Sequence, residues 1–266
     1  MQLSNIHSTA VVDSRAELDS SVTVGPYTVI GPHVKIAAGT TVGPHCVIEG
    51  HTRIGRDNRI FQFVSLGSAN QDKKYAGEPC ELIVGNRNTI REYSTYHIGT
   101  AQGGGVTRLG DDNWMMAYTH LAHDCQVGSD TIFANNAQIA GHVEVGDWAI
   151  FGAYTCVHQF VRIGAHGMTG MGTVLLADQP PFVMSSGNPA TARSMNFEGL
   201  RRRGFSAERV TAVKAMHKAL YRDDLTLDQA REKISALGQG QADVQPDVKM
   251  MLEFLSRSSP QRGIVR

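Results

Sequence analysis

Apolar side chains recur at every sixth position through the first two-thirds of the chain. The first run starts at Ile6 and continues through Val12, Leu18, Val24, Ile30, Ile36, Val42, Ile48, Ile54, Ile60 and Leu66. The same spacing resumes at Val84, Ile90 and Tyr96. After a shift of one position it continues at every sixth residue from Leu109 to Leu175, where Thr169 is the only position that is not apolar. The residue two positions earlier is nearly always small, and residues two apart point the same way on a strand. Each hexad therefore predicts a short strand with one large and one small inward residue.

The short strands predict a parallel β-helix. A turn that often begins with glycine follows each strand, as at Gly25, Gly43 and Gly128, and glycine tolerates the positive φ that corners need. Three such sides close a coil of 18 residues, so equivalent residues of neighbouring coils stack about 4.8 Å apart. The predicted fold is therefore an all-β parallel β-helix of hexapeptide repeats, in which each coil is stabilised mainly by its neighbours. The period does not establish its handedness.

Two polar, glycine-rich segments interrupt the period, at residues 68–82 and 98–108. We expect both to leave the coils as loops. Long loops on a rigid scaffold are where binding groups tend to lie. The β-helix with these two loops is expected to span residues 1–188.

A helical pattern replaces the six-residue period after Asn188. Ser206 precedes one helical stretch, Thr226 and Gln229 form the capping box of a second that ends at Gly238, and Pro246 fits the first turn of a third. Residues 189–266 are therefore predicted to form a small α-helical C-terminal domain. Such a domain also covers the open end of the sheets, which would otherwise be free to aggregate.

Composition limits the function classes. The 266 residues carry 25 basic and 25 acidic side chains, with an acidic balance in residues 1–188 and a basic one in 189–266. This balance does not favour a nucleic-acid groove, although the basic tail suits an acidic partner. The sequence has neither a signal peptide nor an apolar run long enough to span a membrane, and its four cysteines form no CxxC pair. We therefore expect a cytoplasmic protein without a membrane span or a disulfide framework.

Histidines supply the candidate chemistry. Five of them fall within the coils, at His97, His120, His123, His142 and His158. The 18-residue coil places His123 in a column with Gly141 and Gln159, and Asp124 in a column with His142. A histidine beside a carboxylate and facing a glycine one coil away predicts a general base with a backbone N–H for a developing oxyanion.

Other interpretations of these residues stay open. Corner histidines can simply cap turns, and His120, His123 and His142 could instead ligate zinc, as three histidines do in the β-helical γ-class carbonic anhydrases. Cys125 occupies an inward position and is expected to be an inert core thiol. The run 201–203, of three arginines, is a solvated helix face unless it adjoins a substrate cleft, where it would bind phosphate.

Several motifs closely resemble the UDP-N-acetylglucosamine O-acyltransferase family. They are NQDKKYAGEP (70–79), AQGGG (101–105), HLAHDC (120–125), ANNAQIAGHV (134–143), VHQF (157–160), IGAH (163–166) and EGLRRRGFS (198–206). The resemblance covers the loops and the helical tail as well as the coils. It implies a left-handed β-helix with a C-terminal helical domain, assembled as a homotrimer with active sites between subunits.

The resemblance also implies the reaction and the roles of residues. An (R)-3-hydroxyacyl group passes from acyl carrier protein, an acidic protein, to the 3-hydroxyl of UDP-N-acetylglucosamine, the first step of lipid A biosynthesis. His123 is then the general base, Asp124 orients it, and the Gly141 N–H is the oxyanion donor. Matching positions that contact substrate or shape the cleft are Asp72, Lys74, His120, His142, Gln159, Asn196, Glu198, Arg202 and Arg203.

Two details of the resemblance are specific to this chain. Lys73 precedes the matching Lys74, so two lysines compete for one role, and the motif frame favours Lys74. Met171 stands where family members that accept about fourteen-carbon chains have glycine, which implies a shorter acyl donor of about ten to twelve carbons. No metal or redox cofactor is required by this chemistry.

Two rival functions are kept. The related N-acyltransferases of the same pathway usually carry an extra N-terminal domain, whereas this chain begins its coils by Ile6. A non-catalytic trimeric scaffold or a zinc protein would be separated from an acyltransferase by metal analysis and a thioester-consumption assay.

Overall fold

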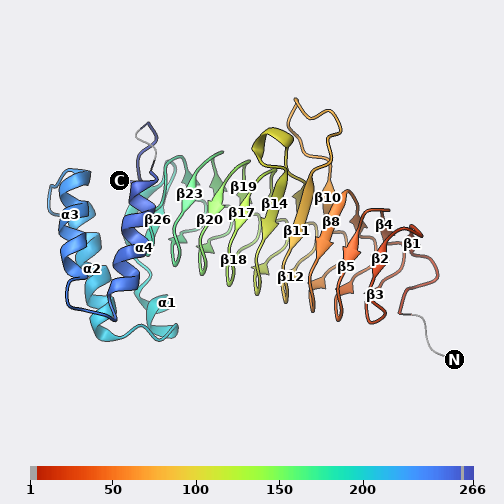
Figure 1. Cartoon of the computed structure of the whole chain (residues 1–266), viewed down its shortest axis with the longest axis horizontal. Helices are drawn as coiled ribbons and strands as arrows, with labels where there is room; N and C mark the ends of the chain where they lie inside the picture. Colours follow the sequence, from red (N-terminus) through yellow and green to blue (C-terminus); the bar gives the residue numbers. More distant parts are fainter. Residues whose placement is uncertain (1–4, 259–260) are drawn as a thin grey trace.

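The computed structural model describes residues 5–258 and 261–266. In that part of the chain, a long stack of coils leads to helices gathered at its C-terminal end (Figure 1). Each coil contributes a strand to each of three sheets, and successive strands of a sheet are parallel throughout the coils. The predicted parallel β-helix is thus confirmed.

The strands fall into three sheets, which we call A, B and C. Sheet A contains β3 (Thr23–Val24), β6 (Thr41–Val42), β9 (Arg59–Ile60), β12 (Thr89–Ile90), β15 (Trp114–Met115), β18 (Ile132–Phe133), β21 (Ile150–Phe151), β24 (Met168–Thr169), β26 (Val183–Ser186) and β27 (Thr191–Met195). Sheet B contains β1 (Val11–Val12), β4 (Val29–Ile30), β7 (Val47–Ile48), β10 (Ser65–Ser68), β13 (Thr95–His97), β16 (His120–Leu121), β19 (Gln138–Ile139), β22 (Cys156–Val157) and β25 (Val174–Leu175). Sheet C contains β2 (Glu17–Leu18), β5 (Lys35–Ile36), β8 (His51–Ile54), β11 (Glu81–Val84), β14 (Val106–Leu109), β17 (Gln126–Val127), β20 (Glu144–Val145) and β23 (Arg162–Ile163).

The sheets meet at three corners, which we name A/B, B/C and C/A. Within a coil the chain runs from sheet B to sheet C to sheet A, and a residue pairs with the residue 18 positions on, as Ile30 pairs with Ile48. The six-residue apolar positions point inward, where Ile30, Leu66 and Phe133 are fully buried. The core therefore fills the inside of the coils, as the periodicity predicts.

Both loops are shorter than the sequence suggested. Residues 69–80 connect β10 to β11, and residues 98–105, with a short 3₁₀ turn at Ala101–Gly103, connect β13 to β14. Residues at the ends of the expected loops, 68–82 and 98–108, belong to strands instead. This is because β11 pairs along its length with both β8 and β14. The two loops project from the same side of the stack (Figure 1).

The C-terminal part begins with a hairpin. Strands β26 and β27 pair antiparallel and extend sheet A, so the expected domain boundary at residues 188–189 lies inside this hairpin. The helices that follow are α1 (Phe197–Arg202), α2 (Ala207–Tyr221), α3 (Leu227–Leu237) and α4 (Gln245–Ser256). The Ser206 cap and the Thr226–Gln229 capping box are confirmed. Helix α1 was not expected from the sequence.

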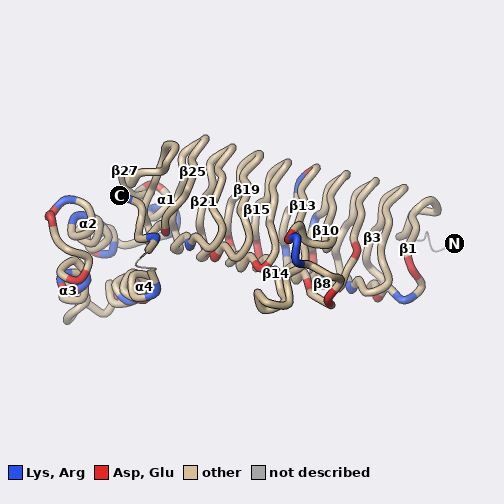
Figure 2. Tube along the Cα trace, turned by 90° about the horizontal axis from the view of Figure 1, so that it is seen from above, with Lys and Arg blue, Asp and Glu red and all other residues tan. Residues whose placement is uncertain are grey.

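The outer faces of sheets B and C differ in charge. The outward column of sheet C carries Glu17, Lys35, Arg53, Arg108, Glu144 and Arg162, whereas that of sheet B, from Val11 to Val174, contains no Asp, Glu, Lys or Arg. Figure 2 shows the charged residues concentrated along one edge of the stack. Among the described residues, no helix is long and apolar enough to cross a membrane.

Candidate active site

His123 lies at the B/C corner, between β16 and β17. Its Nδ1 is 2.8 Å from Oδ2 of Asp124, and only 12% of the histidine side chain and 1% of the aspartate side chain are exposed. Asp124 has φ +61°, in the left-handed region that Asp tolerates better than most residues. The corner turn thus points the imidazole and the carboxylate at each other, leaving Nε2 of His123 for chemistry.

Gly141 occupies the equivalent corner of the next coil. A Cβ at this position would lie 2.4 Å from Cε1 and 2.6 Å from Nε2 of His123, so the imidazole packs where any other residue would place a side chain. Gly141 is buried, and its N–H donates to no acceptor in the described part of the chain. His123, Gly141 and Gln159 line one groove of about 420 Å³, as the coil spacing predicts.

The Asp124 carboxylate is held by the loop 98–105. Its Oδ1 accepts the Thr100 N–H at 2.9 Å, and its Oδ2 accepts the Thr100 hydroxyl at 2.6 Å. Added Cβ atoms at Gly99 and Gly103 would lie 2.8 Å or less from the same carboxylate. The glycine-rich loop therefore folds closely around Asp124, and Thr100 is a residue of this site that sequence reasoning missed.

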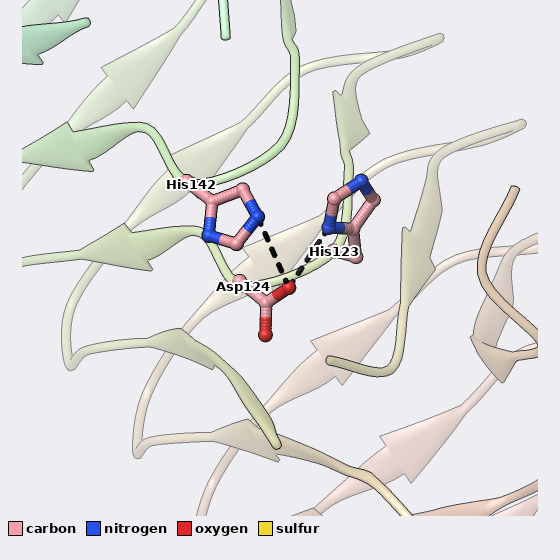
Figure 3. A group of neighbouring side chains, drawn as sticks. All are labelled: His123, Asp124 and His142. Carbon is pink, nitrogen blue, oxygen red and sulfur yellow. Dashed lines mark hydrogen bonds and ion pairs between the residues drawn. The ribbon is translucent and has the colours of Figure 1, made fainter. Parts of the chain in front are cut away.

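His142 is a neighbour of the pair rather than a member of it. Its Nε2 is 3.6 Å from Asp124 Oδ2, beyond hydrogen-bond distance, and its ring meets that of His123 edge to face at 5.0 Å (Figure 3). On its other side it stacks on Phe160. Burial lowers the pKa of His142, and the Asp124 carboxylate opposes that shift.

His120 lies on the outer face of sheet B, inside the same groove. Its Nδ1 is 2.8 Å from the Thr95 hydroxyl, and burial lowers its pKa to about 4, so the imidazole is neutral near pH 7. Gln138 and Cys156 follow it in register and also line the groove. The 18-residue spacing from His120 is the signal that could have identified both.

Asp72 and Lys74 come from the loop 69–80. Asp72 accepts the Lys74 backbone N–H at 2.9 Å and, from the neighbouring loop, the Gln102 side-chain amide at 3.3 Å. The pKa of Asp72 is lowered, chiefly by the Lys74 N–H. The side chains of Lys73 and Lys74 are exposed and make no ion pair within the described residues, so both are available to an anionic ligand.

Helix α1 and its capping residues carry the other four positions that match the family, at a different corner of the coil stack. The Asn196 side chain accepts the Gly199 N–H and caps α1, and Glu198 pairs with Arg202 at 3.0 Å on the exposed face. Arg203 donates to the Trp148 carbonyl at 3.1 Å, at the C/A corner. A single chain therefore does not bring these four residues next to His123.

His166 holds Arg203 at the C/A corner. Its Nδ1 is 3.1 Å from Nη1 of Arg203, whose guanidinium also lies over the Trp148 ring. Burial lowers the pKa of His166 to about 4, with the nearby cations adding to the shift. A neutral imidazole can therefore accept from the guanidinium, an interaction that only the structure reveals.

Met171 lies at the third corner, A/B, between β24 and β25. Its side chain is 78% exposed and does not line the groove of His123. The stacking of Gly172 on Ala153, and of Tyr154 on Asn135, agrees with the predicted column. Within one chain, Met171 thus faces outward.

The structure also shows where Cys125 and the residues of the alternative zinc site lie. Cys125 is fully buried with its Sγ 3.1 Å from the Ala140 carbonyl, and burial raises the pKa of its thiol to about 12, which confirms a core thiol. Among the described residues, the group with metal-ligand geometry is His123, Asp124 and His142, with ligand atoms within 4.8 Å of one another. His120, which the alternative zinc interpretation included, is not part of it, because its ring is turned to Thr95.

Known proteins are similar to this chain in sequence. Residues 178–265 match the family model "Udp N-acetylglucosamine O-acyltransferase; Domain 2". The chain is 70% identical over 264 residues to an acyl-[acyl-carrier-protein]–UDP-N-acetylglucosamine O-acyltransferase of Albidiferax ferrireducens, covering 99% of this chain and 100% of that protein. It is 56% identical, with the same coverage, to the enzyme of that name from Thiobacillus denitrificans.

Solved structures give the same answer for the fold. The UDP-N-acetylglucosamine O-acyltransferase of Moraxella catarrhalis aligns with a TM-score of 0.93 at 39% identity, covering 98% of this chain and 100% of that one. The Francisella novicida UDP-N-acetylglucosamine acyltransferase aligns with a TM-score of 0.93 at 36% identity, covering 98% and 94%. The fold is a left-handed parallel β-helix with a small helical C-terminal part. By sequence and by structure, this chain belongs to the acyl-[acyl-carrier-protein]–UDP-N-acetylglucosamine O-acyltransferase family and is an acyltransferase.

Proposed function

We propose that this enzyme transfers an (R)-3-hydroxyacyl group from acyl carrier protein to the 3-hydroxyl of UDP-N-acetylglucosamine, with His123 as general base. One observation carries the mechanism: the imidazole of His123, paired with Asp124, packs against Gly141, whose N–H has no acceptor in the described part of the chain. Family membership supports the donor and the acceptor, which the relatives' names state for those proteins. This transfer is the first step of lipid A biosynthesis.

The geometry supports one catalytic step for each group. The His123 Nδ1–H donates to Asp124, so Nε2 carries the lone pair that takes the proton of the sugar hydroxyl as its oxygen attacks the thioester carbonyl. The Gly141 N–H stabilises the oxyanion of the tetrahedral intermediate, because a preorganised donor in a water-poor site costs little reorganisation. When the C–S bond breaks, the imidazolium returns its proton to the departing thiolate of the carrier.

We further propose that three chains assemble around their A/B corners. A stack of aromatic rings follows this corner, with Tyr93 4.8 Å from Tyr118 and 5.2 Å from Phe63, and Tyr27 and Tyr154 remain about 60% exposed in one chain. Contiguous exposed apolar side chains are typical of interaction surfaces. The uncharged outer face of sheet B and the apolar positions Trp114, Ile132 and Ile150 of sheet A would be covered by the same assembly.

The proposed homotrimer would also bring together the site residues that one chain holds at two separate corners. With the A/B corners at the axis, sheet B of one chain faces sheet A of the next, so the B/C corner of one approaches the C/A corner of the other. His123 of one subunit and Arg203 of its neighbour then flank one cleft. Asn196, Glu198 and Arg202 would reach the nucleotide from the same side as Arg203, while Asp72 and Lys74 reach it from the loop above His123.

We place the enzyme in the cytoplasm. All four cysteines are unpaired, and three of them are buried, which suits a reducing compartment.

The test is a thioester-consumption assay with UDP-N-acetylglucosamine and a panel of (R)-3-hydroxyacyl carrier-protein thioesters. We expect thiol release that requires both substrates. A second candidate, a metal site at His123, Asp124 and His142, follows from their geometry, so metal content and the effect of a chelator are measured on the same preparation. Stoichiometric zinc, or activity lost with chelator and restored by zinc, would contradict metal-independent base catalysis.

A further inference from the structure

A second groove, of about 920 Å³, lies between the outer face of sheet C and helix α4. Its sheet wall is built from β14, β17, β20 and β23, and three stacked glycines, Gly128, Gly146 and Gly164, leave that wall without side chains at the C/A edge. Helix α4 contributes Met250 and Phe254. The groove therefore combines a flat sheet wall with apolar helix side chains, and none of the proposed chemistry uses it.

Cations outnumber carboxylates around this groove. The basic side chains that line it are Arg108, Arg162, Lys249 and Arg257, and the acidic ones are Glu144 and Glu253. Arg162 is paired with the buried Asp178 at 2.9 Å, so it adds no net charge to the groove.

Arg108 is the cation without a partner. Arg257 pairs with Glu144 at 2.8 Å, and Lys249 lies 3.7 Å from Glu253. Arg108 makes neither an ion pair nor a side-chain hydrogen bond with the described part of the chain. An unpaired guanidinium beside apolar surface favours an acidic, amphipathic occupant.

The groove begins next to the active-site corner. Gln126, on its wall, is three residues from His123, a distance of at most about 11 Å along an extended chain. Glu144, one coil further, is two residues from His142. A ligand in this groove therefore lies beside the B/C corner, on the coils that hold the proposed base.

We propose that this groove docks an acidic amphipathic helix of the acyl carrier protein, an inference that rests on the proposed function. The four strands of the wall span about 14 Å across the sheet, which matches about nine residues of helix. The apolar side of such a helix packs on Met250 and Phe254, and its carboxylates meet Arg108 and Lys249. The thioester arm of the carrier then crosses the B/C corner to His123.

The experiment measures binding separately from chemistry. Fluorescently labelled carrier protein is titrated with the full-length enzyme by anisotropy, using wild type, Arg108→Glu, Lys249→Glu and Met250→Trp. The matched control is Lys35→Glu, a charge reversal on the same outer face of sheet C but far from the groove. We expect at least tenfold weaker binding for the charge reversals and for Met250→Trp, and wild-type binding for Lys35→Glu. Added salt should weaken the binding of wild type more steeply than that of Arg108→Glu.

Turnover supplies an independent readout. The groove variants should raise KM for the acyl carrier protein, leave KM for UDP-N-acetylglucosamine unchanged and leave activity with an acyl-pantetheine thioester unchanged. Wild-type carrier binding by Arg108→Glu and Lys249→Glu, or an equal loss in Lys35→Glu, overturns the docking surface. An enzyme that binds the carrier through these residues but transfers no acyl group supports the docking surface and contradicts the proposed function instead.

Discussion

The Thr100 hydroxyl donates a 2.6 Å hydrogen bond to Oδ2 of Asp124, the oxygen that also faces Nδ1 of His123. Thr100 is 1% exposed, and its backbone N–H binds the other carboxylate oxygen. One residue of the glycine-rich loop thus fixes both oxygens of the group that orients the imidazole. The loop and the proposed base are therefore parts of one hydrogen-bonded unit.

Removal of that hydroxyl should lower turnover without unfolding the enzyme. A hydrogen bond to a charged group contributes about 1.5–3 kcal/mol, so we expect Thr100→Val to lower kcat about 10- to 150-fold. Thr100→Ser keeps the hydroxyl and should stay within about threefold of wild type. Steady-state kinetics of both variants provide the measurement. Equal losses in the two variants would show that Thr100 acts by packing alone.

His123→Ala tests the base directly. General base catalysis supplies about two to four orders of magnitude, so kcat should fall by that factor while the assembly stays folded. The control is the circular dichroism spectrum and the sedimentation of the variant. Near-wild-type turnover in a folded His123→Ala enzyme would remove the central claim of the mechanism.

Coil spacing predicted much of this site because the β-helix is nearly periodic. Residues 18 apart are stacked neighbours, so His123, Gly141 and Gln159 were placed together from their numbers alone. The same spacing explains why Cys125 is an inert core thiol. A fold in which each coil contacts mainly its neighbours converts sequence position into spatial position.

Two features of the site could not be predicted from the coil spacing. Thr100 reaches Asp124 from a loop whose length breaks the 18-residue register, so no column includes it. The position of Arg203 depends on packing of α1 against His166 and Trp148, which are distant in sequence and carry no periodic signal. Nor could the ends of the loops be predicted, because β11 and β14 extend into polar sequence once both neighbouring strands offer hydrogen bonds.

Arg202, the last residue of α1, and Arg203, which follows it, should matter for substrate use. Charge-assisted contacts to phosphate contribute about 1.5–3 kcal/mol, so Arg202→Ala or Arg203→Ala should lower kcat/KM for the sugar nucleotide roughly 10- to 150-fold. Assays at varied UDP-N-acetylglucosamine provide the check. Unchanged kinetics in both variants would reduce the three arginines to a solvated helix face.

Arg203 also offers a test of the proposal that each active site is shared between two subunits. His123→Ala and Arg203→Ala enzymes are each expected to be impaired, but co-expressed chains can form trimers in which one cleft combines an intact His123 with an intact Arg203 of its neighbour. We expect activity of the purified mixed trimers to exceed that of either parent. Absence of any recovery in mixed trimers would contradict a cleft shared between subunits.

Two buried imidazoles should make the fold sensitive to acid. Burial lowers the folded-state pKa of His120 and of His166 to about 4, from the ordinary histidine value of 6.5. Between these values the unfolded chain binds more protons, so stability is complete above about pH 6.5 and falls as the pH drops toward 4. At pH 5 each imidazole should lower the free energy of unfolding by about 2 kcal/mol. Urea midpoints at pH 7.5 and pH 5.0 should differ less in His166→Asn, which keeps an acceptor for Arg203 but does not titrate. An equal pH dependence in His166→Asn and wild type would contradict this role of His166.

Met171 should set the length of the acyl chain. In one chain its side chain stands exposed at the A/B corner, beside the column of Ala153 and Asn135, where the proposed assembly would bury it against a neighbour. The side chain adds four heavy atoms where glycine has none and would close the far end of the acyl groove by several methylenes. A buried methylene contributes only about 0.8 kcal/mol, so a closed end discriminates chiefly by excluding longer chains.

We therefore expect wild-type enzyme to prefer donors of about ten to twelve carbons, and Met171→Gly to shift the preference upward by about two to four carbons. The measurement is kcat/KM across carrier-protein thioesters of eight to sixteen carbons. Met171→Leu is the matched control, because a side chain of similar volume should keep the groove closed and the wild-type preference unchanged. A wild-type preference for fourteen carbons, or an unchanged length profile in Met171→Gly, would place the end of the groove at another residue.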